Sequence, residues 1–225
     1  MRPSPDALQV PFERSRRLRT SEVFAEPCWK PLLDDLMCHH EGAHAVACVL
    51  LGIGLVSVDI IDTSEDDDFL GRCKWATPSD EKPRDREAKA VVCYASREAQ
   101  KRLGGWNALG CECDSRIAQL YLREFQAELT PDPTPDTNQL VSVPMIRKAS
   151  RLVRRAWPAV TAVAEELSPE MNNTGWLSGE AVAAIVGRVL GLETLDTDRT
   201  RAWLLDGGPC VHWGRRARRA LKGAT

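Results

Sequence analysis

Histidine is scarce in this chain, and several other features are missing altogether. The 225 residues include four histidines, two tyrosines and four phenylalanines. The longest apolar run without a charge, Ala45–Val58, is shorter than the roughly 20 apolar residues that a helix needs to cross a bilayer. The N-terminus lacks the apolar segment of a secretory signal. We therefore expect neither a membrane span nor a secretory leader.

The charge balance and the cysteines exclude further classes. Thirty Lys and Arg stand against 32 Asp and Glu, for a net charge of −2, so nucleic-acid binding driven by overall charge is not expected. The eight cysteines include no C-x-x-C pair, which argues against a cysteine-based zinc ribbon. Without a secretory signal, reduced thiols and a cytoplasmic location are expected. The hydrophobic share of 43% is typical of a folded globular protein.

The pattern of apolar residues predicts a mostly α (α+β) protein with a small β hairpin beside one helix. Proline and glycine punctuate the chain and set the expected ends of these elements. Helices are predicted at 31–51, 84–103, 114–129, 145–167 (with a kink or break at Pro158) and 178–190, a short piece at 199–205, and strands at 55–61 and 70–76.

Composition divides the chain into five stretches, which we interpret as one domain with extensions. A basic polar lead-in covers residues 1–28, and a core covers 29–129. A Pro-rich stretch at 130–138 is predicted to be a linker or exposed loop. The C-terminal helical part of the same domain follows at 139–205, and residues 206–225 form a basic tail.

Three of the four histidines lie within six residues, and two belong to an H-E-x-x-H motif that runs from His40 to His44. Positions four apart share one face of a helix, so the imidazoles of His40 and His44 can reach one Zn²⁺ at about 2.0–2.1 Å. Glu41 lies one residue further round and can take a proton from a zinc-bound water. The motif predicts one Zn²⁺ per chain, with Glu41 as catalytic base. His39 points about 100° round the helix from His40 and is expected to be partly exposed or to support the metal ligands. His212 is expected to be a surface residue of the basic tail.

A catalytic zinc usually has a third protein ligand. The H-E-x-x-H-x-x-G-x-x-H form is excluded, because Ala47 and Leu50 stand where it needs glycine and histidine. A downstream carboxylate is therefore expected as the third ligand. From its place at the start of a predicted helix alone, Asp114 is better explained as a simple helix cap. The candidates are Glu65–Asp68, Glu87, Glu98, Glu112 and Asp114. Cys111 and Cys113 are interpreted as loop thiols without a ligand role, or alternatively as ligands of a variant site or sensors of oxidation.

Four segments carry a resemblance to a known family. HHEGAHAVACVLLGIGLVSVDII (39–61) resembles the H-E-A-G-H-A helix and following strand in the peptidase domain of the FtsH family of ATP-dependent zinc proteases. The glycine-containing strand of that domain resembles FLGRCKW (69–75), and its G-G-R-A-A-E helix resembles AVVCYASREAQKRLGG (90–105). The turn and aspartate that open its next helix resemble ALGCECDSRIAQL (108–120). The resemblance covers residues 32–129 and extends weakly to 190. It implies a helical zincin-like fold, a zinc-peptidase core at 29–129, and Asp114 as the third zinc ligand.

The chain also differs from that family. Gly42-Ala43 reverses the usual Ala-Gly of the motif, Ala95-Ser96-Arg97 stands in place of Gly-Gly-Arg, and no P-loop is present. The expected function is that of a soluble stand-alone zinc metallopeptidase acting on peptides or unstructured proteins. A separate ATPase or delivery partner and a homo-oligomer are both compatible with the sequence. The alternatives are a regulatory peptidase specific for one partner protein and a non-catalytic zinc-containing binding or adaptor module.

Overall fold

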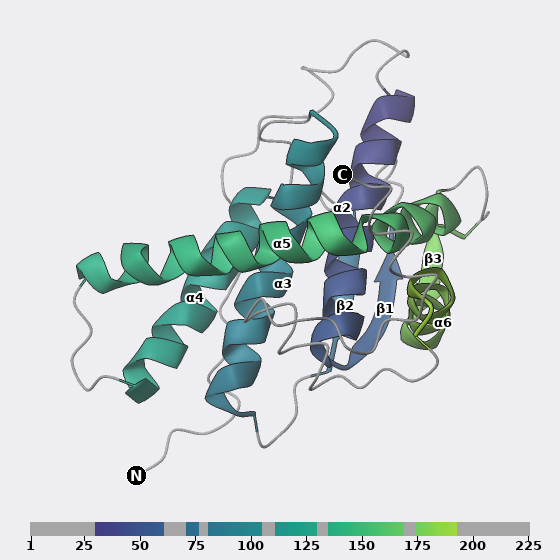
Figure 1. The fold of residues 1–225 in the computed structure, drawn as a ribbon. Coiled ribbons are helices and arrows are strands. Elements are labelled where there is room, and N and C mark those ends of the chain that lie inside the picture. Colours follow the sequence, from purple (N-terminus) through teal and green to yellow (C-terminus); the bar gives the residue numbers. More distant parts are fainter. Residues whose placement is uncertain are drawn as a thin grey trace. The chain divides into compact units, whose positions relative to one another are not determined.

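The computed structural model describes residues 30–60, 71–76, 81–104, 111–129, 135–168 and 174–192 (Figure 1). This part of the chain is mostly helical and contains a small three-stranded antiparallel sheet, which confirms the prediction of a mostly α protein with a small β element. The interactions described below lie within the unit Leu33–Thr225. The predicted lead-in at 1–28, the acidic turn at 63–68, the piece at 199–205 and the basic tail at 206–225 lie outside the described residues.

Helix α2 (Lys30–Leu51) carries the H-E-x-x-H motif and agrees with the predicted range. It ends at Gly52, whose φ of 68° is a left-handed conformation that glycine adopts without strain. The Ile53 N–H then donates to the Cys48 carbonyl at 2.9 Å, which closes the last turn. The chain thereby turns directly from the helix into the first strand.

The sheet has the order β2-β1-β3, so β1 (Leu55–Asp59) lies in its centre. Strand β2 (Arg72–Trp75) pairs antiparallel with β1 and confirms the predicted hairpin. Strand β3 (Trp176–Ser178) pairs with the other edge of β1 and was not predicted. Three residues are too few to show the alternation that identifies a strand in a sequence.

Helices α3 (Pro83–Arg102), α4 (Cys111–Leu129) and α6 (Gly179–Leu190) lie close to their predicted ranges. Local signals explain two of the boundaries. Pro83 is the first residue of α3, where the missing proline N–H costs nothing. The Ser178 hydroxyl caps α6 by accepting from the Ala181 N–H, and Gly191 ends that helix in a left-handed conformation.

Helix α5 (Pro135–Leu167) corrects two predictions. Residues 135–138 were expected in a linker, but the helix begins at Pro135, a position that suits proline. Pro158 was expected to kink or break the helix. A break is wrong, because α5 continues through Pro158 and through Pro144; a kink stays a prediction. Ala156, Ala159 and other residues around Pro158 are fully buried, so tertiary packing outweighs the lost backbone hydrogen bond.

The core surrounds α2, whose C-terminal half is buried on all sides from Ala43 to Leu51. Gly42 explains one departure from the family motif. A Cβ at this position would lie 3.3 Å from the Val160 carbonyl oxygen and 3.4 Å from the Ala164 nitrogen, both in the backbone of α5. The reversed Gly-Ala order therefore fits the close approach of α5 to α2.

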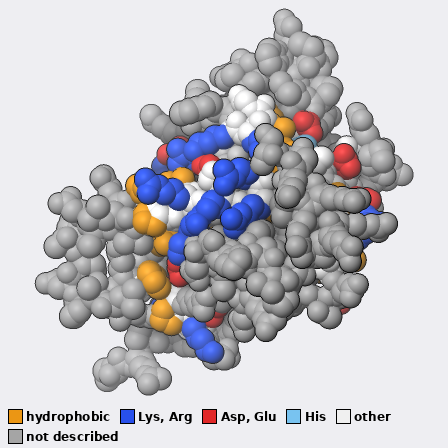
Figure 2. Space-filling view, viewed as in Figure 1, with side chains coloured by type: hydrophobic (Ala, Val, Ile, Leu, Met, Phe, Trp, Pro, Cys, Tyr) orange, Lys and Arg blue, Asp and Glu red, His pale blue; other side chains and the backbone are white. Residues whose placement is uncertain are grey.

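Lysine and arginine side chains gather on the face shown in Figure 2. Helix α5 contributes to this charge, since it has no acidic residue between 137 and 164 but five basic ones, Arg147, Lys148, Arg151, Arg154 and Arg155. Arg147 and Arg154 are exposed, while Lys148 forms an ion pair with Glu87 of α3. Although the net charge is only −2, basic side chains are therefore concentrated on this face of the protein. Within the described residues, no helix is long and apolar enough to span a membrane.

Gly179 at the start of α6 packs against the backbone of β1. A Cβ there would lie 2.0 Å from the Leu55 carbonyl oxygen, which cannot be accommodated without backbone movement. We expect Gly179→Ala to lower the free energy of unfolding by about 3 kcal/mol, the upper end for overpacking, as measured by urea denaturation. Gly54→Ala is the matched control, because its Cβ would meet only the Ala76 Cβ at 3.5 Å. Equal effects of the two substitutions would contradict this packing.

Candidate metal centre

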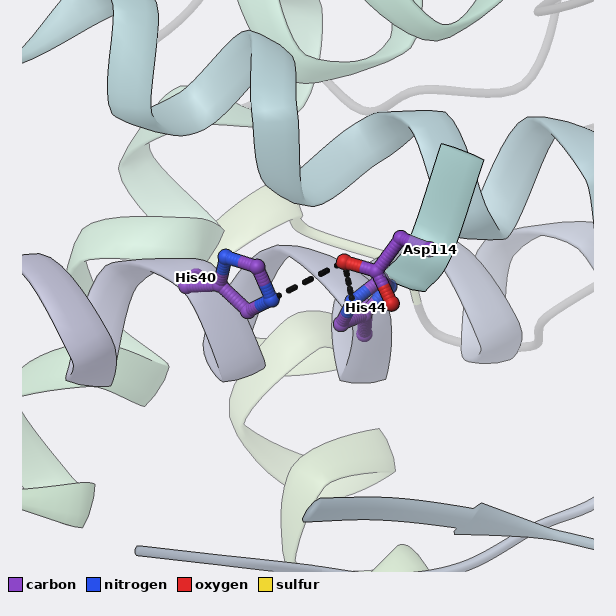
Figure 3. Close-up of side chains that lie close together, drawn as sticks. All are labelled: His40, His44 and Asp114. Carbon is purple, nitrogen blue, oxygen red and sulfur yellow. Dashed lines mark hydrogen bonds and ion pairs between the residues drawn. The ribbon is translucent and has the colours of Figure 1, made fainter. Parts of the chain in front are cut away.

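The side chains of His40, His44 and Asp114 converge on one point (Figure 3). Both histidines project from the same face of α2, and Asp114 reaches them from the first turn of α4. The Asp114 Oδ2 atom lies 3.0 Å from His40 Nε2 and 3.1 Å from His44 Nε2. The donor atoms of all three residues lie within 4.8 Å of one another, so this buried group could hold a metal ion.

The orientation of His44 is fixed by a hydrogen bond from α3. Its Nδ1 donates to the Val92 carbonyl at 2.9 Å, which leaves Nε2 as the atom with the lone pair in the neutral ring. That lone pair faces the Asp114 carboxylate, so a positive species has to lie between them. Such a second hydrogen bond is what a metal-binding histidine usually makes.

In the metal-free protein, a proton supplies this positive charge. Burial opposes a charge on His44, but the Asp114 carboxylate, with help from Glu41 and the Val92 carbonyl, raises the pKa of His44 to about 9. Burial also opposes ionisation of Asp114, yet His44 and His40 hold the pKa of Asp114 well below its usual range. The site is therefore a carboxylate facing an imidazolium, which is a charge pattern that a divalent cation can replace.

The distances from Asp114 to the two histidines fit a small tetrahedral ion. Two ligands about 2.0 Å from such an ion lie about 3.3 Å apart, close to the 3.0 and 3.1 Å between the histidine nitrogens and Asp114. His40 Nδ1 is buried and has no hydrogen-bond partner among the described residues. The residues present thus fit a metal bound by two imidazoles and one carboxylate.

Glu41 lies beside this group without belonging to it. Its Oε1 atom is 3.9 Å from His40 Nε2, and its buried Oε2 has no hydrogen-bond partner in the described part of the chain. Burial raises the pKa of Glu41; the two histidines lower it, and Asp114 and Asp59 raise it further. A carboxylate with a raised pKa accepts and releases a proton more readily near neutral pH than an exposed one.

The strand β2 begins immediately next to Glu41. A Cβ at Gly71 would lie 2.5 Å from Glu41 Cγ and 2.8 Å from Glu41 Oε1. Any larger residue at this position would therefore push against the carboxylate. Gly71 belongs to the FLGRCKW segment, and the structure gives a physical reason for its glycine.

Asp114 is not the simple helix cap that we considered as an alternative. Its Oδ2 accepts a hydrogen bond from the Ser96 hydroxyl of α3 at 2.8 Å, in addition to its contacts with the two histidines. Sequence reasoning did not identify Ser96 as part of the site. The available signal was its place in Ala95-Ser96-Arg97, where the resembled motif has Gly-Gly-Arg.

The other carboxylates considered as ligands have partners elsewhere. Glu98 bonds to Lys101 at 2.6 Å, and Glu112 bonds to Arg116 at 2.7 Å on the surface of α4. Glu87 is paired with Lys148 of α5. Glu65–Asp68 lie outside the described residues. Among the candidates that the structure places, Asp114 alone reaches the two histidines.

The remaining sequence candidates stay apart from the metal group. His39 is buried, donates to the Asp35 carbonyl at 2.9 Å and stacks on Trp157. The expectation that His39 is partly exposed is therefore wrong. Cys111 and Cys113 lie in the first turn of α4 rather than in a loop, and Cys113 is exposed. Burial raises the pKa of Cys111 to about 11, which keeps it a thiol. His212 lies outside the described residues.

Comparison with known proteins adds no family to this picture. Neither the protein-family models nor the curated protein sequences that were compared with the chain match it.

Proposed function

We propose that this protein is a zinc metallopeptidase that hydrolyses peptide bonds. The observation that carries the proposal is the convergence of His40 and His44 of α2 with Asp114 of α4, with the buried carboxylate of Glu41 beside them. A purely structural metal site has no need of an adjacent base with a raised pKa. Zinc is the metal that suits two imidazoles and one carboxylate with a position left for substrate or water.

The roles of the residues follow from their positions. His40, His44 and Asp114 would hold the ion, which when bound polarises the scissile carbonyl and makes a water molecule acidic. Glu41 takes a proton from the attacking water and later gives it to the leaving amine. Burial of Glu41 raises its pKa, which favours a role in both proton transfers.

The fold that we propose is the helical zincin-like domain of the FtsH peptidase family, with residues 29–129 as its core. Support comes from the ordered segments that resemble that domain and from the position of Asp114, 70 residues after His44. The substrates that we propose are peptides or unstructured protein segments. A folded protein would need a separate partner to unfold it before it could reach the buried site.

Metal dependence tests the proposal directly. The purified protein is stripped with a chelator, and hydrolysis of fluorescently labelled casein and of a mixed fluorogenic peptide library is measured before and after one equivalent of Zn²⁺ per chain. We expect the stripped protein to be inactive and the single equivalent to restore activity, since the proposed site of His40, His44 and Asp114 would take one ion. The Asp114→Ala protein, treated identically, should not recover.

Two other results would favour the alternatives. Stoichiometric zinc binding without turnover of any substrate would favour a non-catalytic adaptor module. Turnover of one partner protein but neither casein nor the library would favour a regulatory peptidase. A protein that binds no zinc at all would contradict the proposal entirely.

A further inference from the structure

The carboxylate of Asp114 is held by a hydroxyl from the neighbouring helix. Ser96 of α3 is completely buried, and its Oγ lies 2.8 Å from Asp114 Oδ2 and 3.2 Å from the Cys93 carbonyl oxygen. A serine hydroxyl has one proton to donate. The ionised carboxylate is the closer and stronger acceptor, so the proton is directed at Asp114.

Asp114 needs such a contact because of where it lies. It stands in the first turn of α4, on a different helix from the two histidines. Its side chain keeps 18% of its surface exposed, whereas those of His40 and His44 keep 3% and 5%. Of the three candidate ligands, Asp114 is therefore the one with room to rotate.

A second contact ties the same turn of α4 to α3. The Cys111 thiol donates to the Gln100 side-chain oxygen at 2.7 Å. Ser96 and Gln100 are four residues apart and share one face of α3, while Cys111 and Asp114 share the first turn of α4. Gln100 thus fixes the start of the helix, and Ser96 acts on the carboxylate itself.

We propose that Ser96 is a positioning residue that holds the Asp114 carboxylate toward His40 and His44 and thereby increases the affinity of the site for a divalent metal. This inference rests on the proposed function, because it assumes that the three residues bind metal. Hydrogen bonds to metal ligands typically change metal affinity by about 10- to 100-fold. The loss of the Ser96 hydroxyl should have an effect of this size.

The experiment compares wild-type protein with Ser96→Ala and a matched control, Ser115→Ala. Ser115 follows Asp114 in α4, and its hydroxyl donates to the Cys111 carbonyl at 2.7 Å instead of to a ligand. The dissociation constant for Zn²⁺ is measured by competition with a chromophoric chelator. The visible spectrum of the Co²⁺-loaded protein reports the geometry of the ligands. Circular dichroism verifies that each variant is folded; alanine favours the helical state at position 96.

We expect Ser96→Ala to bind Zn²⁺ about 10- to 100-fold more weakly and to show an altered Co²⁺ spectrum, with Ser115→Ala resembling the wild type in both. A Ser96→Ala protein with wild-type affinity and spectrum would overturn the inference alone. A wild-type protein that binds no metal would overturn the proposed function as well. Equal losses in both variants would assign the effect to helix α4 in general and also overturn the role of Ser96.

Discussion

Glu41→Gln is expected to reduce turnover by about 10²- to 10⁴-fold, the range for loss of a general acid–base group, while leaving zinc binding intact. Glutamine has nearly the same shape but cannot accept the proton of the attacking water. Glu41 is not one of the three residues that could bind the ion, so the metal content should stay at one ion per chain. The rate is measured as kcat on the best peptide from the library, with zinc determined on the same sample.

Glu112→Gln is the matched control for this substitution. Glu112 carries the same chemical group two residues before Asp114, but it is exposed and bonds to Arg116 at 2.7 Å. Its replacement should leave kcat within about twofold, since exposed ion pairs of this kind contribute little. If Glu41→Gln kept more than a tenth of the wild-type rate, Glu41 would not be the base.

Zinc affinity is expected to rise about tenfold for each pH unit between pH 6.5 and about 9. Binding requires His44 in its neutral form, whereas the pKa of His44 is raised to about 9 in the metal-free protein because the nearby Asp114 carboxylate outweighs the cost of burial. Each unit below that value therefore leaves tenfold less of the competent form. Competition titrations with a chelator of known protonation constants measure the slope. A flat profile would show that the metal-free His44 is not protonated.

The same shift predicts how the stability of the metal-free protein changes with pH. The pKa of His44 is higher in the folded protein than its ordinary value of 6.5, so the stability that His44 contributes is complete below pH 6.5 and is lost as pH rises through about 9. The loss corresponds to about 3 kcal/mol at 1.36 kcal/mol per pKa unit. The raised pKa of Glu41 acts in the same direction. Asp114 acts in the opposite direction, because its pKa is lowered. The stability that it contributes is present above its usual pKa of 3.8 and is lost as pH falls below that value. Denaturant titrations across the pH range measure both effects.

Sequence signals that are local predicted their part of the structure well. Helix α2 follows from its apolar run and Gly52, and strand β1 follows from its β-branched, partly alternating residues. The pairing of His40 with His44 follows from helical periodicity alone. Each of these depends on residues that are close together in the sequence, where spacing along the chain largely determines position in space.

Features that depend on packing could not be derived in the same way. Strand β3 is defined by its pairing with β1, which is distant in the sequence, and α5 continues through Pro158, whose neighbours are buried. Asp114 was one of several carboxylates on grounds of chemistry, and only a family resemblance singled it out. Ser96 was missed because a serine in the middle of a helix gives no sequence signal of a metal site. Only the packing of α3 on α4 places it against that carboxylate.

The three candidate ligands are divided unequally between two helices. His40 and His44 are brought together by a single turn of α2, but Asp114 arrives only when α4 has docked, 70 residues later in the chain. A newly made polypeptide that has formed α2 alone would hold a metal by two imidazoles at most. If the protein is the peptidase that we propose, cleavage would begin only in fully folded molecules, and neither the nascent chain nor its surroundings would be cut prematurely.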